Sequence, residues 1–368
     1  MFDTKALEEA DRIVTICNAC RYCEGLCAVF PAIETKRSFI TSDLNYFANL
    51  CHGCGACYQD CQFSPPHEFN VNLPRVLAQV RADSYKSYTW PRAFGPIFDH
   101  NGILISFIAE MSVTGFILAF VTAGNPNALF ASGIEPGAFY RLMPHDAMAG
   151  LFGAVFVYAI AAITFGFRAF WRDIGPISAG AGSSLWQAIR DAGELRYLGG
   201  GGDGCRNTDD IAADRRKLYH HLTFYGFLLC FAATVVATFY HYGLGRPAPY
   251  AWYEVPVILG TAGGIGLFIG TLGLLAAKLR RNPNMEDLPR RGMDIAFTLM
   301  LCLTALTGLA LLAFRATPAM GILLALHLGF VFALFLTLPY SKFVHGLYRF
   351  GALLRYAIDT RGGLKLVE

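Results

Sequence analysis

Charged residues are scarce in this sequence. Only 15% of its 368 residues are Asp, Glu, Lys or Arg, whereas 54% are hydrophobic and 14% are aromatic. Soluble domains carry about 25% charged residues, so the shortage is typical of a membrane protein. The charges that are present are dense before residue 95 and in a few later loops. This distribution indicates a polar N-terminal domain followed by membrane-embedded helices, and we expect no nucleic-acid partner.

Two common targeting and cofactor motifs are also missing. Residues 1–16 contain no basic segment followed by an apolar run, so we do not expect a signal peptide. The C-x-x-C-H motif for covalent haem attachment is missing, because Glu24 follows Cys23 and Tyr58 follows Cys57. We expect no disulfide network either, since no signal directs the cysteines to an oxidising compartment.

Eight of the eleven cysteines lie in two runs that repeat one spacing. The runs are Cys17-x2-Cys20-x2-Cys23-x3-Cys27 and Cys51-x2-Cys54-x2-Cys57-x3-Cys61. This spacing is typical of [4Fe–4S] ligation, and two such runs usually exchange their last cysteine. Zinc sites instead use two C-x2-C pairs or mix cysteine with histidine. We therefore predict two clusters, the first held by Cys17, Cys20, Cys23 and Cys61 and the second by Cys51, Cys54, Cys57 and Cys27.

The N-terminal domain, residues 1–95, is predicted to be helical. Residues 42–50 have a helix-capping start and apolar residues at helical spacing, and residues 73–82 form a basic amphipathic pattern. No strand-like alternation lies between the cysteine runs. These features favour an α-helical ferredoxin-like, two-cluster domain. The aromatic residues that follow are expected at the membrane interface, where ring faces meet lipid: Tyr85, Tyr88 and Trp90.

Six apolar stretches are long enough to cross a bilayer. They lie near residues 102–123, 147–167, 220–242, 255–277, 293–314 and 319–341. We therefore predict an all-α protein in which residues 96–368 form a six-helix transmembrane bundle. One long loop, residues 168–219, interrupts it.

Arginine and lysine are unevenly distributed between the loops. They are frequent in the 168–219 loop, in the loop after the fourth span and in the C-terminal segment. The alternate loops hold little beyond Arg141, Arg246 and Arg315. Because basic loops remain in the cytoplasm, we predict a multi-pass protein of the bacterial inner membrane. Both termini, the 168–219 loop and the cysteine-rich domain would face the cytoplasm.

The long loop contains the run GGGGDGC at residues 199–205. This run is not a G-x-G-x-x-G fingerprint after a strand, so it does not predict nucleotide binding. We expect a close backbone turn that packs against the cysteine-rich domain or a partner, with Cys205 as a structural residue.

Histidines occur at matching depths in the third and sixth spans. His220 or His221 opens the third span and His241 closes it, whereas His327 lies within the sixth span and His345 just beyond it. The last two are 18 residues apart, which is five helical turns and about 27 Å. Because bundle cores commonly hold haem between imidazoles, we predict haem b at two depths. The inner ligands would be His220 or His221 with His345, and the outer ligands His241 with His327.

These pairings leave two alternatives open. His220 is the better inner candidate than His221, because it lies within about 60° of His241 on a helical wheel. At the start of the second span, His145 is the main rival for the outer ligand. The number of haems is one or two.

Several segments together resemble one known family. They are the doubled cysteine motif, CQFSPPHEFNVNLPRVLAQVRADSY at 61–85, the GGGGDGC loop and RRKLYHHLTFYGFLLCFAATVVATFYHYG at 215–243. They are similar to the tricarballylate (or citrate) utilisation B proteins, the TcuB/CitB type. The resemblance implies a membrane protein with two [4Fe–4S] clusters and haem b. Its partners would be a soluble FAD-dependent tricarballylate dehydrogenase of the TcuA type, whose reduced flavin it reoxidises, and the membrane quinone that takes the electrons.

The residues alone indicate the same class of protein. Clusters in the cytoplasm, a haem bundle in the membrane and no dehydrogenase domain suit an electron-transfer, quinone-reducing subunit of a flavin-dependent oxidoreductase system. Two alternatives remain, a redox-sensing membrane protein and a transporter with a regulatory cluster domain. The presence of haem would distinguish the electron-transfer subunit from both alternatives. A transporter would instead need discontinuous helices and polar sites at the membrane midplane.

Overall fold

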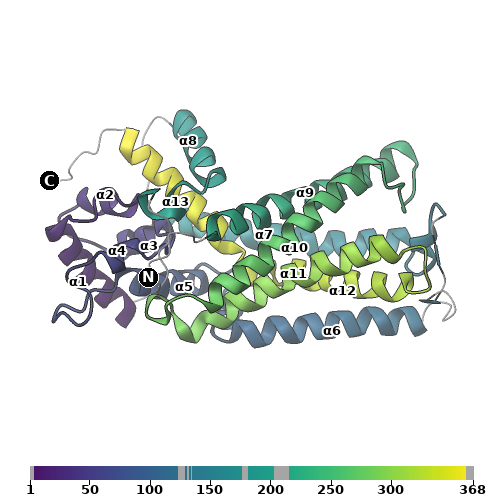
Figure 1. Cartoon of the computed structure of the whole chain (residues 1–368), viewed down its shortest axis with the longest axis horizontal. Coiled ribbons are helices and arrows are strands. Elements are labelled where there is room, and N and C mark those ends of the chain that lie inside the picture. The colour runs from purple at the N-terminus through teal and green to yellow at the C-terminus, as the bar shows by residue number, and fades with distance from the viewer. Residues whose placement is uncertain are drawn as a thin grey trace.

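A computed structural model describes residues 4–122, 129–130, 132–133, 135–175, 181–202 and 215–361. In these residues every regular element is a helix, which confirms the predicted all-α class. Figure 1 shows a compact head of short helices at one end of the molecule and long helices that extend from it to the other end. The head contains the cysteine runs, so the domain that is rich in thiols is placed at one end of the bundle.

Side-chain caps define where the helices of the head begin. Thr4 accepts a hydrogen bond from the Leu7 amide at 3.4 Å, and Asn72 accepts one from the Arg75 amide at 3.2 Å. Such caps satisfy amides that have no partner within the helix. The helices of the head are α1 (Lys5–Cys20), α2 (Val29–Glu34), α3 (Thr41–Leu50), α4 (Ala56–Gln59) and α5 (Leu73–Ser87).

The core of the head also includes residues from the far end of the chain. Leu353 and Ala352 of α13 (Val344–Arg361) are buried in the same apolar cluster as Leu77 and Phe47. Phe170 near the end of α7 joins this cluster too. The head is therefore not built from residues 1–95 alone, because a helix that follows the last span completes its core.

Tyr85 and Tyr88, at the C-terminal end of α5, belong to this core and not to a membrane interface. Tyr85 is 1% exposed and Tyr88 is 8% exposed, and both rings lie about 6 Å from the ring of Tyr348 in α13. The predicted interfacial position is wrong for these two, because α13 covers the surface that the sequence left open. Trp90 is 39% exposed.

In the part of the chain that the structure describes, six apolar helices are long enough to cross a membrane, as predicted. Counted with their flanking turns, they cover Arg92–Thr122, His145–Asp173, Arg216–Leu244, Val255–Leu279, Leu288–Phe314 and Met320–Tyr340. Their α-helical parts are α6 (Asn101–Thr122), α7 (His145–Asp173), α9 (Arg216–Leu244), α10 (Val255–Leu279), α11 (Arg291–Phe314) and α12 (Met320–Thr337). Short 3₁₀ turns flank them, including η1 (Arg92–His100), η3 (Ala138–Arg141) and η7 (Leu338–Tyr340). Before α9 the chain forms α8 (Ala181–Gly193) and η4 (Arg196–Gly202).

Glycines allow α9 and α10 to pack with their backbones in contact. A Cβ atom on Gly226 would lie 2.5 Å from the amide nitrogen of Leu267, and one on Gly263 would lie 2.8 Å from the carbonyl oxygen of Gly226. Any larger residue at either position would push the helices apart, as at other small-residue helix interfaces in membranes. This contact fixes the position of α9, which contains three of the histidines of interest.

Candidate functional site

Thiols from both runs surround the first of two cysteine-lined pockets in the head. Cys17 and Cys20, at the end of α1, face Cys23 from the following turn and Cys61 from the second run. Cys57 reaches the edge of the same pocket. The structure therefore brings together the four thiols that we predicted for the first cluster.

The second pocket is surrounded by the remaining thiols. Cys27, Cys51, Cys54 and Cys57 line it, together with Tyr197 of η4. Cys27 is the last cysteine of the first run, so each run contributes its final thiol to the pocket of the other. This arrangement is the exchange that is common in two-cluster ferredoxins.

Burial disfavours the ionised form of two of these thiols, Cys17 and Cys27. Burial, followed by the nearby thiols of Cys61, Cys23 and Cys20, raises the pKa of Cys17 to about 12. For Cys27, burial and then Cys51 and Cys54 raise the thiol pKa in the same direction. Four crowded thiols suit a cationic iron–sulfur cluster, because metal binding removes their protons and the repulsion between them. The donor set thus fits such a cluster.

The glycine-rich loop covers the second pocket. Gly200 of η4 has a φ of +54°, and a Cβ atom there would lie 2.9 Å from Cβ of Ala56 and 3.4 Å from Sγ of Cys54. Only glycine adopts this conformation readily and leaves room for the close approach. The predicted close turn against the cysteine-rich domain is confirmed at Gly200. Cys205 lies outside the described residues.

Arginines surround the backbone at the start of the second cysteine run. Four of them donate hydrogen bonds to carbonyl groups of residues 48–53: Arg81, Arg216, Arg281 and Arg349. They come from α5, α9, the turn after α10, and α13. The shortest of the bundle contacts joins Arg281 Nη2 to the Gly53 carbonyl oxygen at 2.7 Å. Positive charge near a cluster favours its reduced, more negative state.

The inner histidines lie where the bundle meets the head. The ring centroids of His220 and His345 are 6.2 Å apart. A metal–imidazole bond of about 2 Å, with the nitrogen about 1 Å from the ring centre, gives roughly the same separation for two ligands of one iron. His221 instead lies against Tyr225, with ring centroids 5.9 Å apart. Of the two inner candidates, the structure therefore places His220 beside His345.

Protonation and hydrogen bonding also suit ligation by this pair. The Nδ1 atom of His345 is hydrogen-bonded to the Lys342 carbonyl, which requires the proton on Nδ1 and leaves Nε2 free to bind a metal. Burial and the nearby Arg349 hold the pKa of His345 well below its ordinary value, so its ring is neutral. His220 Nδ1 is buried without a hydrogen-bond partner in the described part of the chain. The residues present fit a bis-histidine haem iron.

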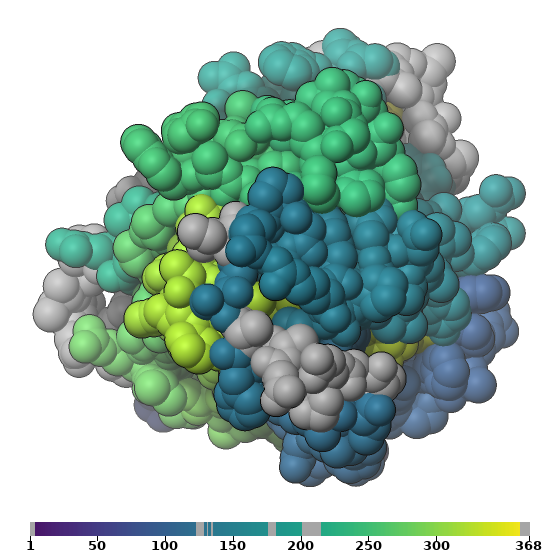
Figure 2. Space-filling model, turned by 90° about the vertical axis from the view of Figure 1, so that its right-hand side faces the viewer, coloured from purple at the N-terminus to yellow at the C-terminus, as the bar shows by residue number. Residues whose placement is uncertain are grey.

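The outer pair differs from the prediction. His241 stacks on His145 of α7, with ring centroids 3.5 Å apart and planes inclined by 11°. Tyr140 of η3 meets both rings edge-on. Figure 2 shows this end of the molecule, where the outer part of α9 (green) lies beside the start of α7 (dark teal). The alternative ligand His145, and not His327, is therefore the neighbour of His241, and the stack is too close for an iron atom between the rings.

His327 packs against α11 and does not pair with His241. Its Nδ1 is 3.2 Å from Thr307 Oγ1, and a Cβ atom on Gly308 would lie 2.9 Å from its Cε1. Both neighbours belong to α11, so the imidazole is directed at the adjacent helix and not toward α9. The predicted pairing with His241 is not found, because α11 supplies both the space and a hydrogen-bond partner.

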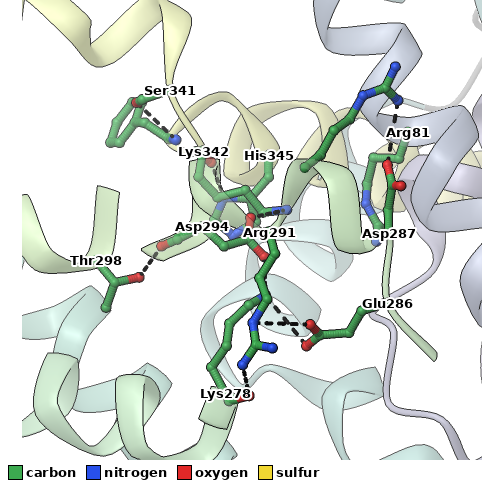
Figure 3. Close-up of polar contacts among 12 residues, drawn as sticks. Arg81, Lys278, Glu286, Asp287, Arg291, Asp294, Thr298, Ser341, Lys342 and His345 are labelled. Carbon is green, nitrogen blue, oxygen red and sulfur yellow. Dashed lines mark hydrogen bonds and ion pairs between the residues drawn. The ribbon is translucent and has the colours of Figure 1, made fainter. Parts of the chain in front are cut away.

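Ion pairs connect the bundle to the segment that leads into α13. Asp294 in the first turn of α11 pairs with Lys342 at 2.9 Å and with Lys278 at the end of α10. Glu286 lies 3.6–3.7 Å from the cationic groups of Lys278 and Arg291 (Figure 3). Since Lys342 is three residues before His345, this network holds the inner histidine segment against two span ends.

The sequence does not mark Arg81, Arg281 or Arg349 as site residues. Arg281 belongs to the basic loop after the fourth span and Arg349 to the basic C-terminal segment. Arg216, with Lys342 as the alternative, is instead expected from the sequence to pair with an inner haem propionate. Arg216, Arg281 and Arg349 each lie beside the end of a span or just after the last one, which is also where a cytoplasmic domain must touch the bundle. Their position beside the span ends is the feature of the sequence that could have identified them as contacts of the head.

Comparisons with known proteins agree with this architecture. Residues 10–87 match the family model described as "Citrate utilization protein B Fer4-like domain", and residues 103–363 match "Citrate utilization protein B". The chain is 48% identical over 361 residues to "Citrate utilization protein B" of Escherichia coli, which covers 98% of this chain and 94% of the relative. No solved structure matches the chain. With a Fer4-like head, six apolar helices and matches over nearly its whole length, the chain belongs to the citrate utilization protein B family.

Proposed function

We propose that this protein passes electrons from the reduced flavin of a partner dehydrogenase, of the tricarballylate dehydrogenase type, to membrane quinone. The observation that carries the proposal is the link that Arg349 makes between the second thiol pocket and the helix of the inner histidine His345. Arg349 donates to the Cys51 carbonyl at 2.8 Å and lies one helical turn after His345. Two groups of redox-cofactor ligands therefore meet at the junction of head and bundle.

The ligands would be divided between three cofactors. Two [4Fe–4S] clusters and one haem b would supply one-electron carriers when bound. The first cluster would be held by Cys17, Cys20, Cys23 and Cys61, the second by Cys27, Cys51, Cys54 and Cys57, and the haem by His220 and His345. We do not extend the proposal to a second, outer haem, because His145 and His241 lie too close together.

The positions of the pockets suggest a direction for the electrons. The first pocket is bordered by Tyr22, which is 72% exposed, and so lies near the surface of the head. The second pocket lies beside the arginines that come from the bundle. A flavoprotein partner would dock near the first pocket, and the electrons would leave through the second pocket toward His345.

The membrane orientation is part of the same proposal. The arginine-rich span ends lie on the side of the bundle that contacts the head. By the positive-inside rule, this side and the head would face the cytoplasm of a bacterial inner membrane. Of the two alternatives, the transporter finds no support in the six span helices, since each is continuous over its described length.

Cofactor content tests the proposal directly. Protein purified without oxygen should contain about eight non-haem iron atoms, about eight acid-labile sulfides and about one haem b, the sum for two cubanes and one haem. Both cofactor types should be reduced by dithionite and reoxidised by added quinone. Four iron atoms, bound zinc, or a protein without haem would contradict it.

A further inference from the structure

A cavity of about 520 Å³ lies in the bundle at the end nearest the head. It lies between η1, α6, α7 and the end of α12, and its walls are formed mainly by Leu104, Ile105, Ile108, Val155 and Leu336. No charged side chain lines it among the described residues. Sites for small molecules commonly have volumes of about 300–1,000 Å³ and apolar walls with a few convergent polar groups.

Two phenol groups supply the polar end of this cavity. The hydroxyl oxygens of Tyr158 and Tyr340 are 2.5 Å apart, and the Tyr340 hydroxyl donates to the Trp90 carbonyl at 3.2 Å. With the Tyr340 proton used in this way, Tyr158 is the donor within the pair. Tyr158 is only half-buried, so its hydroxyl can turn to another acceptor, whereas Tyr340 is 6% exposed and held in place.

The cavity has an opening toward lipid and is close in sequence to the inner histidine. Ala154 and Phe94, which line it, are exposed on the outside of an apolar bundle. Tyr340 precedes His345 by five residues: it ends η7, which directly follows α12, and His345 lies in the first turn of α13. An apolar ligand can therefore reach the phenol pair from the membrane.

We propose that this cavity binds the ring of an isoprenoid quinone, with Tyr158 donating a hydrogen bond to one ring carbonyl and the tail directed toward lipid. The inference rests on the proposed function, which supplies the electrons. The quinone would take up two electrons from the cofactors and two protons from cytoplasmic water, so that each carbonyl oxygen becomes a hydroxyl group. A dicarboxylate or other charged substrate does not suit a lining without cations, and an acyl chain makes no use of the phenol pair.

Photolabelling of the full-length protein in lipid nanodiscs tests this site. The probe is a short-chain azidobenzoquinone, in competition with decylbenzoquinone, and labelled peptides are mapped by mass spectrometry. We expect label in residues 94–108, 154–158 or 336–340. Ala154→Leu, which fills the cavity, should reduce the labelling about tenfold or more. Tyr158→Phe, which removes one hydrogen bond, should weaken quinone binding about three- to tenfold.

Two matched variants serve as controls. Ala119→Leu makes the same change on an exposed face of α6 outside the cavity, and Tyr253→Phe removes a hydroxyl from a 65% exposed tyrosine. Both should label like the unchanged protein. Label elsewhere, label insensitive to Ala154→Leu, or no label that decylbenzoquinone displaces would overturn the inference and leave the cavity to lipid. Iron, sulfide and haem contents are measured on the same samples, so a failure of the proposed function is seen separately.

Discussion

Substitution of single cysteines distinguishes two ways of holding the clusters: each run keeping its last cysteine, or the two runs exchanging it. Cys61 lines the same pocket as Cys17, although 44 residues separate them in the sequence. We therefore expect Cys61→Ser and Cys17→Ser to abolish the same electron paramagnetic resonance signal and about half of the non-haem iron. Cys51→Ser should abolish the other signal. The control is Cys230→Ser, in the middle of α9, which should keep both.

A second prediction at the scale of single residues concerns the haem ligands. His345→Ala should remove haem b, because its ring faces His220 at the spacing of two ligands on one iron. His327→Ala is the matched control, since its imidazole bonds to Thr307 and packs on Gly308. Pyridine haemochrome spectra measure the outcome. If His327→Ala loses the haem and His345→Ala retains it, our assignment of the ligand pair is wrong.

At the scale of elements, the η4 turn is where we expect one added methyl group to affect the stability of a cluster. Gly200→Ala places a methyl group 2.9 Å from Ala56 Cβ in a left-handed conformation, which costs about 1–3 kcal/mol. We expect the turn to lift from Cys54 and the second cluster to be lost faster in air. Gly199→Ala is the control, because a Cβ atom there has no neighbour within 4 Å. The absorbance decay of both variants in air is the measurement, and equal decay rates would contradict the role of Gly200 as a cover.

The membrane spans and the cysteine runs were predictable from the sequence, whereas the contacts between the spans were not. The spans were predictable because length and hydropathy are local properties, and the thiol sets were predictable because their spacing follows cluster chemistry. The partner of His241 was not, since it depends on how α9 is rotated and on which helix lies next to it. The glycines at 226 and 263 fix α9 on α10, and this contact between the two backbones is not a local property of the sequence.

For the whole molecule, the orientation in the membrane is the property to measure. The arginines that face residues 48–53 come from span ends and from α13, so the head and α13 lie on the same side of the bundle. A C-terminal alkaline phosphatase fusion, which is active only outside the cytoplasm, should therefore be inactive. The same reporter after residue 246, between α9 and α10, should be active. The reverse pattern would contradict the proposed cytoplasmic position of the head.

The position of α13 has a consequence for how the protein is made. Leu353 and Ala352 of α13 complete the core of a head whose first helices are at the opposite end of the chain. A ribosome synthesises the head first and α13 last, and domains begin to fold during synthesis. The core of the head is therefore completed only after the six spans have been synthesised, because all six precede α13 in the sequence.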